Sequence, residues 1–188
     1  MQLLILDRDG VINRDSDSYV KSAAQWIPLP GSIEAIARLS KAGFTVVVAT
    51  NQSGLSRGLF GIDELEDMHR KMCQLVEDAG GHIDGIFYCP HLPEDHCQCR
   101  KPASGLFSAI AAQYGVSLHG VPVVGDSLRD LQAGLCLDCL PILVRSGKGA
   151  SNEPLLREAD DALLNKALVF DDLASVATYL LDPSRNSP

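Results

Sequence analysis

Two carboxylates separated by one residue follow the first apolar run of the chain. Asp7 and Asp9 come directly after residues 3–6, and Gly10 permits a tight turn beside them. If the chain curls there, one carboxylate can attack a phosphorus atom while the other transfers a proton. The same spacing also occurs in solvated turns and calcium loops, so the pair gains meaning only from the rest of the chain.

A hydroxyl-bearing turn and a pair of cations could hold a phosphoryl group. Residues 50–54 read Thr-Asn-Gln-Ser-Gly, and a hydroxyl with several backbone N–H groups at a strand end makes a natural phosphate cradle. Lys101 can neutralise a phosphoryl oxygen as a point charge, and Arg100 can grip a second phosphate or a hydroxyl bidentately. The alternatives are an ordinary turn after a strand and two surface cations.

A second acidic segment could complete a cation site. Residues 125–130 read Gly-Asp-Ser-Leu-Arg-Asp. Asp126 together with Asp7 would supply oxygen ligands for a hard cation, and Mg²⁺ suits phosphate chemistry. Asp130 would brace the site, for example by pairing with Lys101. Capping of the following helix by Asp126 or by the serine after it is the alternative, because both residue types are common caps.

A cluster of cysteines and a histidine has the composition of a structural zinc site. Cys89 and His91 lie at one end of a short loop, and Cys97 and Cys99 lie at the other. Ligand pairs placed in this way can close a tetrahedral Zn²⁺ site with no open position, and such a site would fold a loop that has no core of its own. His96 is a competing ligand, and free thiols in a surface loop are the alternative.

The other cysteines are expected to be inert. Cys136 and Cys139 have the spacing of a redox pair, but leucines flank them on both sides. We therefore expect both thiols to be buried in the core, as we do for Cys73 on a long predicted helix.

Composition excludes several classes of protein. The chain has 188 residues, a net charge of −8 and 46% hydrophobic residues. The negative charge argues against general nucleic-acid binding, although a metal ion and a few cations can reverse the field locally. No unbroken apolar stretch is long enough to cross a membrane, and the N-terminus does not resemble a signal peptide. We expect a cytoplasmic protein, in which clustered cysteines favour metal binding over disulfides.

Alternating strands and helices must position these groups. Strands are predicted over residues 3–6, 45–49, 86–88, 121–124, 141–144 and 168–170. Helices are predicted between residues 32 and 43 and over residues 63–79, 106–114, 128–135 and 173–181. The alternation predicts an α/β fold, with one Rossmann-like parallel sheet and helices on both faces. The carboxyl ends of such strands line the ligand crevice, so distant polar residues can converge there.

Domain organisation follows from the same pattern. No linker is long enough to separate two domains, and no internal repeat is present. Residues 1–182 are expected to form a single domain, and residues 183–188 are expected to be a disordered tail.

The order of the four phosphate-related clusters resembles that of the haloacid dehalogenase superfamily of phosphatases, over residues 3–130. The resemblance implies that Asp7 is the nucleophile, which forms an aspartyl-phosphate, and that Asp9 is the general acid and base. It also implies that Thr50 and Lys101 hold the phosphoryl group. The Mg²⁺ ligands that the resemblance implies are Asp7, the backbone carbonyl of Asp9, and Asp126.

The zinc loop narrows the resemblance. The segments Asp-Arg-Asp-Gly-Val-Ile-Asn, Thr-Asn-Gln-Ser-Gly, Cys-Pro-His and Cys-Arg-Lys-Pro resemble the D-glycero-D-manno-heptose 1,7-bisphosphate 7-phosphatase family over residues 3–148. This implies a bacterial enzyme that removes the 7-phosphate on the route to lipopolysaccharide. That family lacks a large cap domain, so the loops at residues 15–19, 54–61 and 89–99 would act as a lid. The implied substrate contacts are Asp15, Ser16, Ser18, Tyr19, Asn51, Gln52, Ser53 and Arg100.

Further expectations accompany this resemblance. Arg57 is expected as an additional phosphate partner. The partner of the protein is expected to be a small sugar bisphosphate, with no nucleic acid and no membrane, and the protein is expected to be a monomer. Ser127 stands where some members of the family carry a lysine, which puts the anomer preference in doubt.

Two alternatives remain open. Histidinol-phosphate phosphatases share this subfamily and its zinc loop, but a cationic histidinol would want carboxylates in the lid rather than Arg57 and Arg100. The alternative from another class is a non-enzymatic sugar-phosphate or metal-binding module. The presence of both Asp7 and Asp9 argues against it, because a pure binder needs no nucleophile.

Overall fold

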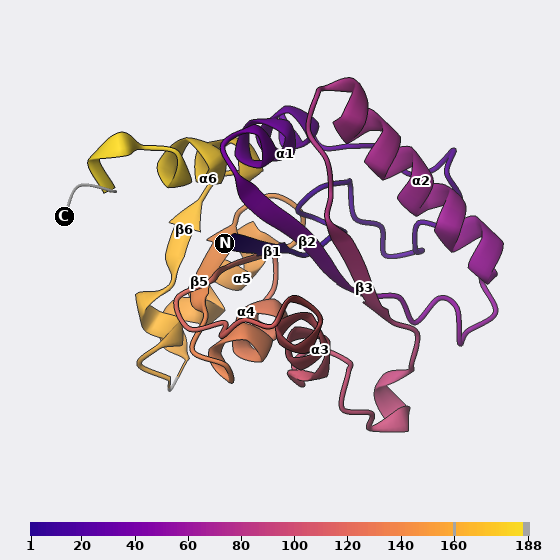
Figure 1. The fold of residues 1–188 in the computed structure, drawn as a ribbon. Helices are drawn as coiled ribbons and strands as arrows, with labels where there is room; N and C mark the ends of the chain where they lie inside the picture. The colour runs from indigo at the N-terminus through magenta and orange to yellow at the C-terminus, as the bar shows by residue number, and fades with distance from the viewer. Residues whose placement is uncertain (160, 186–188) are drawn as a thin grey trace.

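A computed structural model describes residues 1–159 and 161–185 of the chain. In these residues, six strands form one sheet in the order β3-β2-β1-β4-β5-β6 (Figure 1). Every neighbouring pair is parallel. The strands are β1 (Gln2–Leu6), β2 (Phe44–Asn51), β3 (Gly85–Cys89), β4 (Pro122–Gly125), β5 (Leu140–Val144) and β6 (Leu168–Phe170). All six coincide with predicted strands.

Helices cover both faces of the sheet, as the alternating pattern predicts. The helices are α1 (Ser32–Lys41), α2 (Ile62–Asp78), α3 (Gly105–Tyr114), α4 (Leu128–Leu135), α5 (Gly149–Glu158) and α6 (Leu173–Leu180). Helices α1, α2 and α6 lie on one face, and α3, α4 and α5 lie on the other (Figure 1). No large cap domain is inserted in the described part of the chain, and none of its helices is long and apolar enough to span a membrane.

Strand β1 shows why the strands are nearly continuous apolar runs. Leu4 and Leu6 pack into the core beneath α1 and α2, whereas Leu3 and Ile5 pack on the opposite face beside α3. Successive side chains of a strand point to opposite faces. Because helices cover both faces, all four positions are buried and must be apolar.

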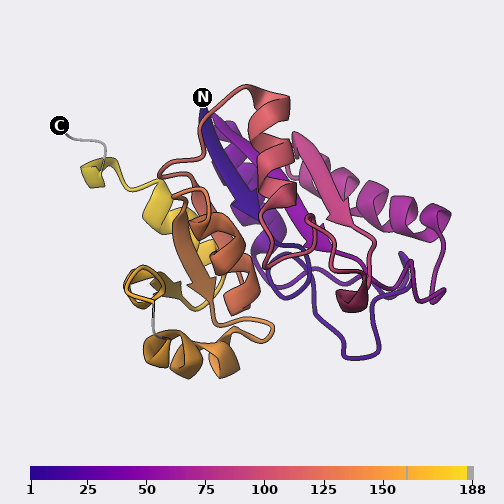
Figure 2. The same cartoon turned by 90° about the horizontal axis from the view of Figure 1, so that it is seen from below.

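The strand order reverses beside β1, and this reversal creates the crevice. The chain runs outward from β1 through β2 to β3, and then returns to place β4 on the other side of β1. Leu6 is paired in register with Val124, so β1 and β4 end at the same level. Ligands bind at such switch points in open parallel sheets. Asp7 follows β1 and Asp126 follows β4, and Figure 2 shows the long loop after β1 at this edge of the sheet.

Helix α5 was not predicted from the sequence. Its residues include Pro154, and its apolar positions do not form a clear stripe. Tertiary contacts stabilise it instead, because Leu156 packs against Leu131 and Leu143 on the sheet face. A salt bridge of 2.6 Å also joins Glu153 to Arg145 after β5.

The expectation of two buried thiols at Cys136 and Cys139 is wrong for Cys136. Cys139 is buried, but Cys136 caps the C-terminus of α4 and is exposed. Cys73 is only partly buried, because it lies beside the buried stripe of α2 rather than within it.

The expected tail lies at the edge of the described residues. Pro183–Arg185 forms a short 3₁₀ turn, and residues 186–188 lie outside the described part of the chain. The disordered tail and the single domain over residues 1–182 therefore stay predictions.

Candidate active site and metal centres

Asp7 lies at the bottom of the crevice, at the end of β1. Its Oδ1 atom accepts a hydrogen bond of 2.8 Å from the backbone N–H of Arg8 and lies 2.9 Å from Nζ of Lys101. Burial and the neighbouring carboxylates of Asp130 and Asp126 outweigh the attraction of Lys101 and raise the pKa of Asp7 to about 8. The site therefore holds more negative charge than its own lysine can neutralise.

Lys101 reaches the crevice from the segment that follows the cysteine cluster. Its ammonium also contacts Oδ1 of Asp130 at 2.6 Å and the carbonyl of Ala49 at 2.8 Å, and the side chain is buried. Two hydrogen bonds of 3.1 Å between the Asn51 side chain and the Lys101 backbone hold this segment against β2. Burial would lower the pKa of Lys101, but Asp130 and Asp7 outweigh it and hold the pKa above its usual value. Lys101 is thus a fixed cation.

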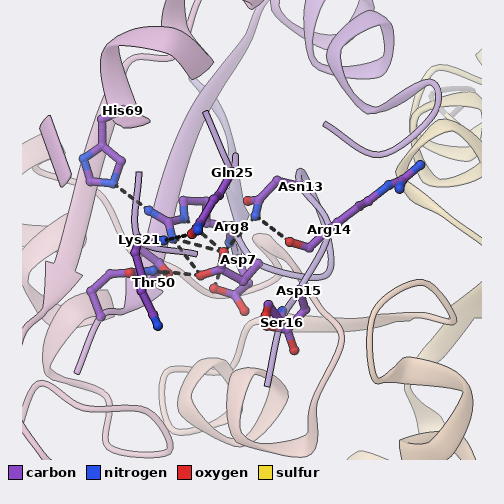
Figure 3. Close-up of polar contacts among 12 residues, drawn as sticks. Asp7, Arg8, Asn13, Arg14, Asp15, Ser16, Lys21, Gln25, Thr50 and His69 are labelled. Atoms are coloured by element: carbon purple, nitrogen blue, oxygen red, sulfur yellow. Dashed lines mark hydrogen bonds and ion pairs between the residues drawn. The ribbon is translucent and has the colours of Figure 1, made fainter. Parts of the chain in front are cut away.

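Asp9 is surrounded by donors. Nη2 of Arg8 lies 3.0 Å from both carboxylate oxygens, Asn13 donates a bond of 2.8 Å to Oδ1, and Gln52 donates a bond of 2.8 Å to Oδ2. Burial would raise the pKa of Asp9, but Arg8 and these hydrogen bonds outweigh it and lower the pKa. Figure 3 shows Arg8 and Asn13 converging on this region beside Asp7.

Gln52 links the Thr50 turn to the carboxylate of Asp9. Its amide nitrogen donates both to Asp9 and, at 2.9 Å, to the hydroxyl of Thr50. Thr50 and Gln52 are both buried at the end of β2. The structure thus brings the predicted Thr50 hydroxyl next to the carboxylate pair.

Asp126 is held between two glycines. A Cβ atom added at Gly10 or at Gly147 would collide with Oδ2 of Asp126, and both glycines have positive φ. The backbone N–H of Lys148 donates a bond of 2.8 Å to the same oxygen. Burial and the nearby Asp130 outweigh this bond and raise the pKa of Asp126 to about 7. Only glycine fits at these two positions, and the backbone on both sides restricts the orientation of the Asp126 carboxylate.

The acidic residues fit a hard cation. Oxygen atoms of Asp7, Asp126 and Asp130 all lie within 4.8 Å of one another. The oxygens of Asp130 are already engaged by Lys101 and by the N–H and hydroxyl of Ser127, at 2.6, 3.1 and 2.7 Å. Asp7 and Asp126 are therefore the better carboxylate ligands for Mg²⁺, and a divalent cation would relieve the repulsion that raises their pKa values. Coordination by the Asp9 carbonyl stays a prediction.

The cysteine cluster fits zinc. Cys89, His91, Cys97 and Cys99 place their ligand atoms within 4.8 Å of one another. The Sγ–Sγ distances are 3.1, 3.5 and 3.6 Å, and Nδ1 of His91 lies 3.2 and 3.5 Å from two of the sulfurs. A tetrahedral zinc–thiolate site has edges of about 3.8 Å, so a modest expansion would admit the ion. The competing His96 is exposed and is not part of the cluster.

A cavity of about 280 Å³ opens above these groups. Most of the predicted substrate contacts line it. These are Asp15, Ser16, Tyr19, Asn51, Gln52, Ser53 and Arg100. Ser18 and Arg57 do not line this cavity, and both are exposed. Nη1 of Arg100 donates a bond of 3.2 Å to the carbonyl of His91, which ties the cavity wall to the cysteine cluster.

Lys148 is a cavity residue that sequence reasoning missed. Its Nζ lies 3.1 Å from Oδ2 of Asp15 and 3.3 Å from Oδ1 of Asp17, while its backbone binds Asp126. One signal could have revealed it. Ser-Gly-Lys-Gly at residues 146–149 follows a predicted strand, at the same sheet edge as the other motifs.

Comparisons with known proteins agree with this geometry. The family model described as polynucleotide kinase 3 phosphatase matches residues 3–127, and the HAD-hydrolase-like model matches residues 98–176. A D-glycero-β-D-manno-heptose-1,7-bisphosphate 7-phosphatase of Pseudomonas aeruginosa is 54% identical, over 95% of this chain and 97% of that protein. The corresponding protein of Bordetella bronchiseptica is 53% identical, over 96% of this chain and 98% of that protein.

A solved structure shows the same fold. The crystal structure of D,D-heptose 1,7-bisphosphate phosphatase from B. bronchiseptica, complexed with magnesium and phosphate, superposes with a TM-score of 0.91 at 52% sequence identity. The match covers 96% of this chain and 98% of that one. The fold and the relatives together define a phosphatase of the haloacid dehalogenase class, a phosphoric monoester hydrolase, as the four motifs predicted. Within that class, the chain belongs to the D-glycero-β-D-manno-heptose-1,7-bisphosphate 7-phosphatase family.

Proposed function

We propose that this protein hydrolyses the 7-phosphate of D-glycero-D-manno-heptose 1,7-bisphosphate through an aspartyl-phosphate on Asp7. The observation that carries the proposal is the convergence of a nucleophile, a second carboxylate and a buried lysine on one cavity. The names of relatives more than 50% identical over nearly the whole chain support the substrate.

In the first step, an oxygen of Asp7 attacks phosphorus and the bond to the sugar oxygen breaks. Lys101 and Thr50 hold the phosphoryl oxygens, while Asp9 gives its proton to the leaving alkoxide. The donors around Asp9 favour its ionised form, but an approaching phosphate dianion adds negative charge and favours the protonated form.

In the second step, Asp9 takes a proton from water as the water oxygen attacks the phosphorus of the aspartyl-phosphate. The bond from phosphorus to the Asp7 oxygen breaks, which releases inorganic phosphate, restores the Asp7 carboxylate and leaves Asp9 protonated for the next cycle. A bound Mg²⁺ would supply charge stabilisation for the phosphoryl oxygens, with Asp7 and Asp126 as its ligands. Zinc at Cys89, His91, Cys97 and Cys99 would be structural.

We assign the second phosphate of the substrate to the part of the cavity that carries Arg100 and Lys148. Arg100 and Lys148 both line it, and both could contact an anion that lies away from Lys101. Lys148 is held by two carboxylates and is half-exposed, so a phosphate would have to compete with Asp15 and Asp17. Arg100 has no ion-pair partner among the described residues and is a stronger candidate than Lys148.

The cellular setting belongs to the same proposal. The protein is a monomeric, cytoplasmic enzyme of lipopolysaccharide precursor synthesis, with neither nucleic acid nor membrane as partner. The net charge of −8 argues against nucleic acid as a partner, and the small polar cavity suits a phosphorylated sugar.

A substrate comparison tests the proposal. Purified protein with Mg²⁺ is given both anomers of the heptose bisphosphate, histidinol phosphate and a set of sugar monophosphates, and kcat/KM is measured for each. We expect the heptose bisphosphate to be preferred, with the 7-phosphate lost. Preference for histidinol phosphate would replace the proposed substrate, and binding without turnover of any ester would favour a non-enzymatic module.

A further inference from the structure

His69 lies outside every motif described above, yet its side chain reaches the active site. It projects from α2 beside the buried positions Leu65, Met68 and Met72, which fix the helix against the sheet. Its Nε2 atom lies 3.4 Å from Nη1 of Arg8, and Figure 3 shows the imidazole directed at that guanidinium.

The contact with Arg8 defines the tautomer of the His69 imidazole. A guanidinium carries only donors, so Nε2 of His69 must accept the hydrogen bond and the ring proton must lie on Nδ1. Burial and the nearby Arg8 lower the pKa of His69 to about 4, so the ring is neutral near pH 7. The ring of Tyr88 packs beside it, with centroids 6.1 Å apart, which limits its rotation.

Arg8 has little freedom beyond this contact. It is 1% exposed, and its Nε and Nη2 atoms are engaged by the carboxylate of Asp9 at 3.0–3.3 Å. Among the described residues, His69 is the side-chain acceptor for Nη1. Without that acceptor, a buried donor is left unsatisfied. The guanidinium would then turn to find another partner, and its hold on Asp9 would weaken, leaving Asn13 and Gln52 as the remaining side-chain donors to that carboxylate.

We propose that His69 is a positioning residue, which holds Arg8 so that Arg8 holds the carboxylate of Asp9 for proton transfer to the leaving group. The inference rests on the proposed role of Asp9 as general acid. Helix α2 carries none of the reacting groups, but through His69 it would help to fix the orientation of the Asp9 carboxylate.

Leaving-group dependence separates this role from a general effect on folding. A sugar alkoxide needs a proton as it departs, whereas p-nitrophenolate departs as a stable anion. We expect His69→Leu to lower kcat/KM for the sugar bisphosphate about 10-fold, a part of what a general acid contributes. The same variant should change kcat/KM for p-nitrophenyl phosphate by less than about 3-fold. The loss should lie in kcat, because His69 does not line the cavity.

Three variants frame the measurement. His69→Gln should restore most of the activity, because an amide oxygen can accept from Arg8. His119→Leu removes an exposed histidine far from this network and should change neither substrate. If His69→Leu does not fold, His69→Asn replaces it, because its shorter amide cannot reach Arg8 and should show the same difference between substrates.

Asp9→Asn distinguishes failure of the inference from failure of the proposed function. If Asp9→Asn lowers kcat/KM equally for both substrates, Asp9 is not the general acid and the proposed mechanism is wrong, because kcat/KM reports the steps up to departure of the leaving group and not the later hydrolysis. If Asp9→Asn slows the sugar substrate selectively but His69→Leu slows both equally, the mechanism stands and His69 is merely structural. Equal activity of His69→Leu and wild type on both substrates would also overturn the inference.

Discussion

The ammonium of Lys101 lies 2.9 Å from the carboxylate of Asp7, although Asp7 follows β1 and Lys101 follows both β3 and the cysteine cluster. This ion pair keeps the nucleophile beside the cation that would bind the phosphoryl group. The same lysine also pairs with Asp130, so the fold should survive loss of the Asp7 charge while the chemistry should not.

Asp7→Asn should therefore fold and lose turnover by at least about 1,000-fold, because an amide cannot attack phosphorus as a carboxylate does. The unfolding temperature and kcat/KM of the variant are compared with those of Asp67→Asn, which removes an exposed carboxylate of α2 that does not line the cavity. Near-normal turnover by Asp7→Asn would contradict the covalent mechanism.

The cysteine cluster should hold about one zinc ion per chain. Cys97→Ser should lower zinc content and thermal stability together, because a structural metal contributes folding free energy. Cys136→Ser, which changes an exposed cysteine outside the cluster, is the matched control and should retain zinc. Protein purified without chelator and found free of zinc would count against the site.

Arg100→Ala should lower kcat/KM for a bisphosphate more than kcat/KM for a monophosphate. A charge-assisted bidentate contact is worth about 1.5–3 kcal/mol, which corresponds to a change of roughly 10- to 150-fold in the ratio of the two kcat/KM values. Lys101→Ala should instead slow every substrate. Arg57→Ala serves as control, because Arg57 is exposed and does not line the cavity.

A purely structural role for Arg100 would give a different result. Its bond to the carbonyl of His91 could serve only to secure the cysteine cluster. In that case, Arg100→Ala would reduce zinc retention and slow both substrates equally, and the proposal of a second anionic group in the substrate would lose its support.

Acid should destabilise the wild type through His69. Its pKa is about 4 in the fold and 6.5 as the reference value, so the unfolded chain binds the proton first as the pH falls. The stabilising contribution is thus present above pH 6.5 and is lost towards pH 4. Between pH 7 and pH 5 the free energy of unfolding should fall by about 1–2 kcal/mol from this group, after allowance for partial exposure.

The measurement is urea unfolding at several pH values for wild type and His69→Gln. The charged groups that face His69 are Arg8 and Asp9, and Tyr88 packs on its ring. These groups remain in the variant, so the difference between the two proteins isolates the imidazole. Parallel pH profiles for both would show that His69 is not held neutral by the fold.

Local pattern was sufficient to predict most of the architecture. Apolar runs on both faces of β1 and the stripe of Leu65, Met68 and Met72 on α2 follow directly from periods of two and 3.6 residues. The same pattern predicts a parallel sheet, and a parallel sheet brings strand ends to one edge. The placement of Asp7 and Asp126 at one crevice was therefore predictable before any contact was known.

Helix α5 and the thiol at Cys136 were decided by tertiary packing. The helix has weak amphipathic pattern and an internal proline, and Leu156 and the salt bridge of Glu153 stabilise it only once β5 is in place. The leucines around Cys136 point into the core from the end of α4 while the thiol points out, and spacing alone does not show where a helix ends in space.

The sequence by itself determined which groups are available for the chemistry and at which edge of the sheet they gather, because those follow from residue type and strand periodicity. Only the tertiary structure decided how the site is held. Lys148 reaches Asp126 through its backbone, and His69 reaches Arg8 from a helix without catalytic groups. Such contacts depend on the angles and separations at which elements pack, and no local period of the sequence encodes these.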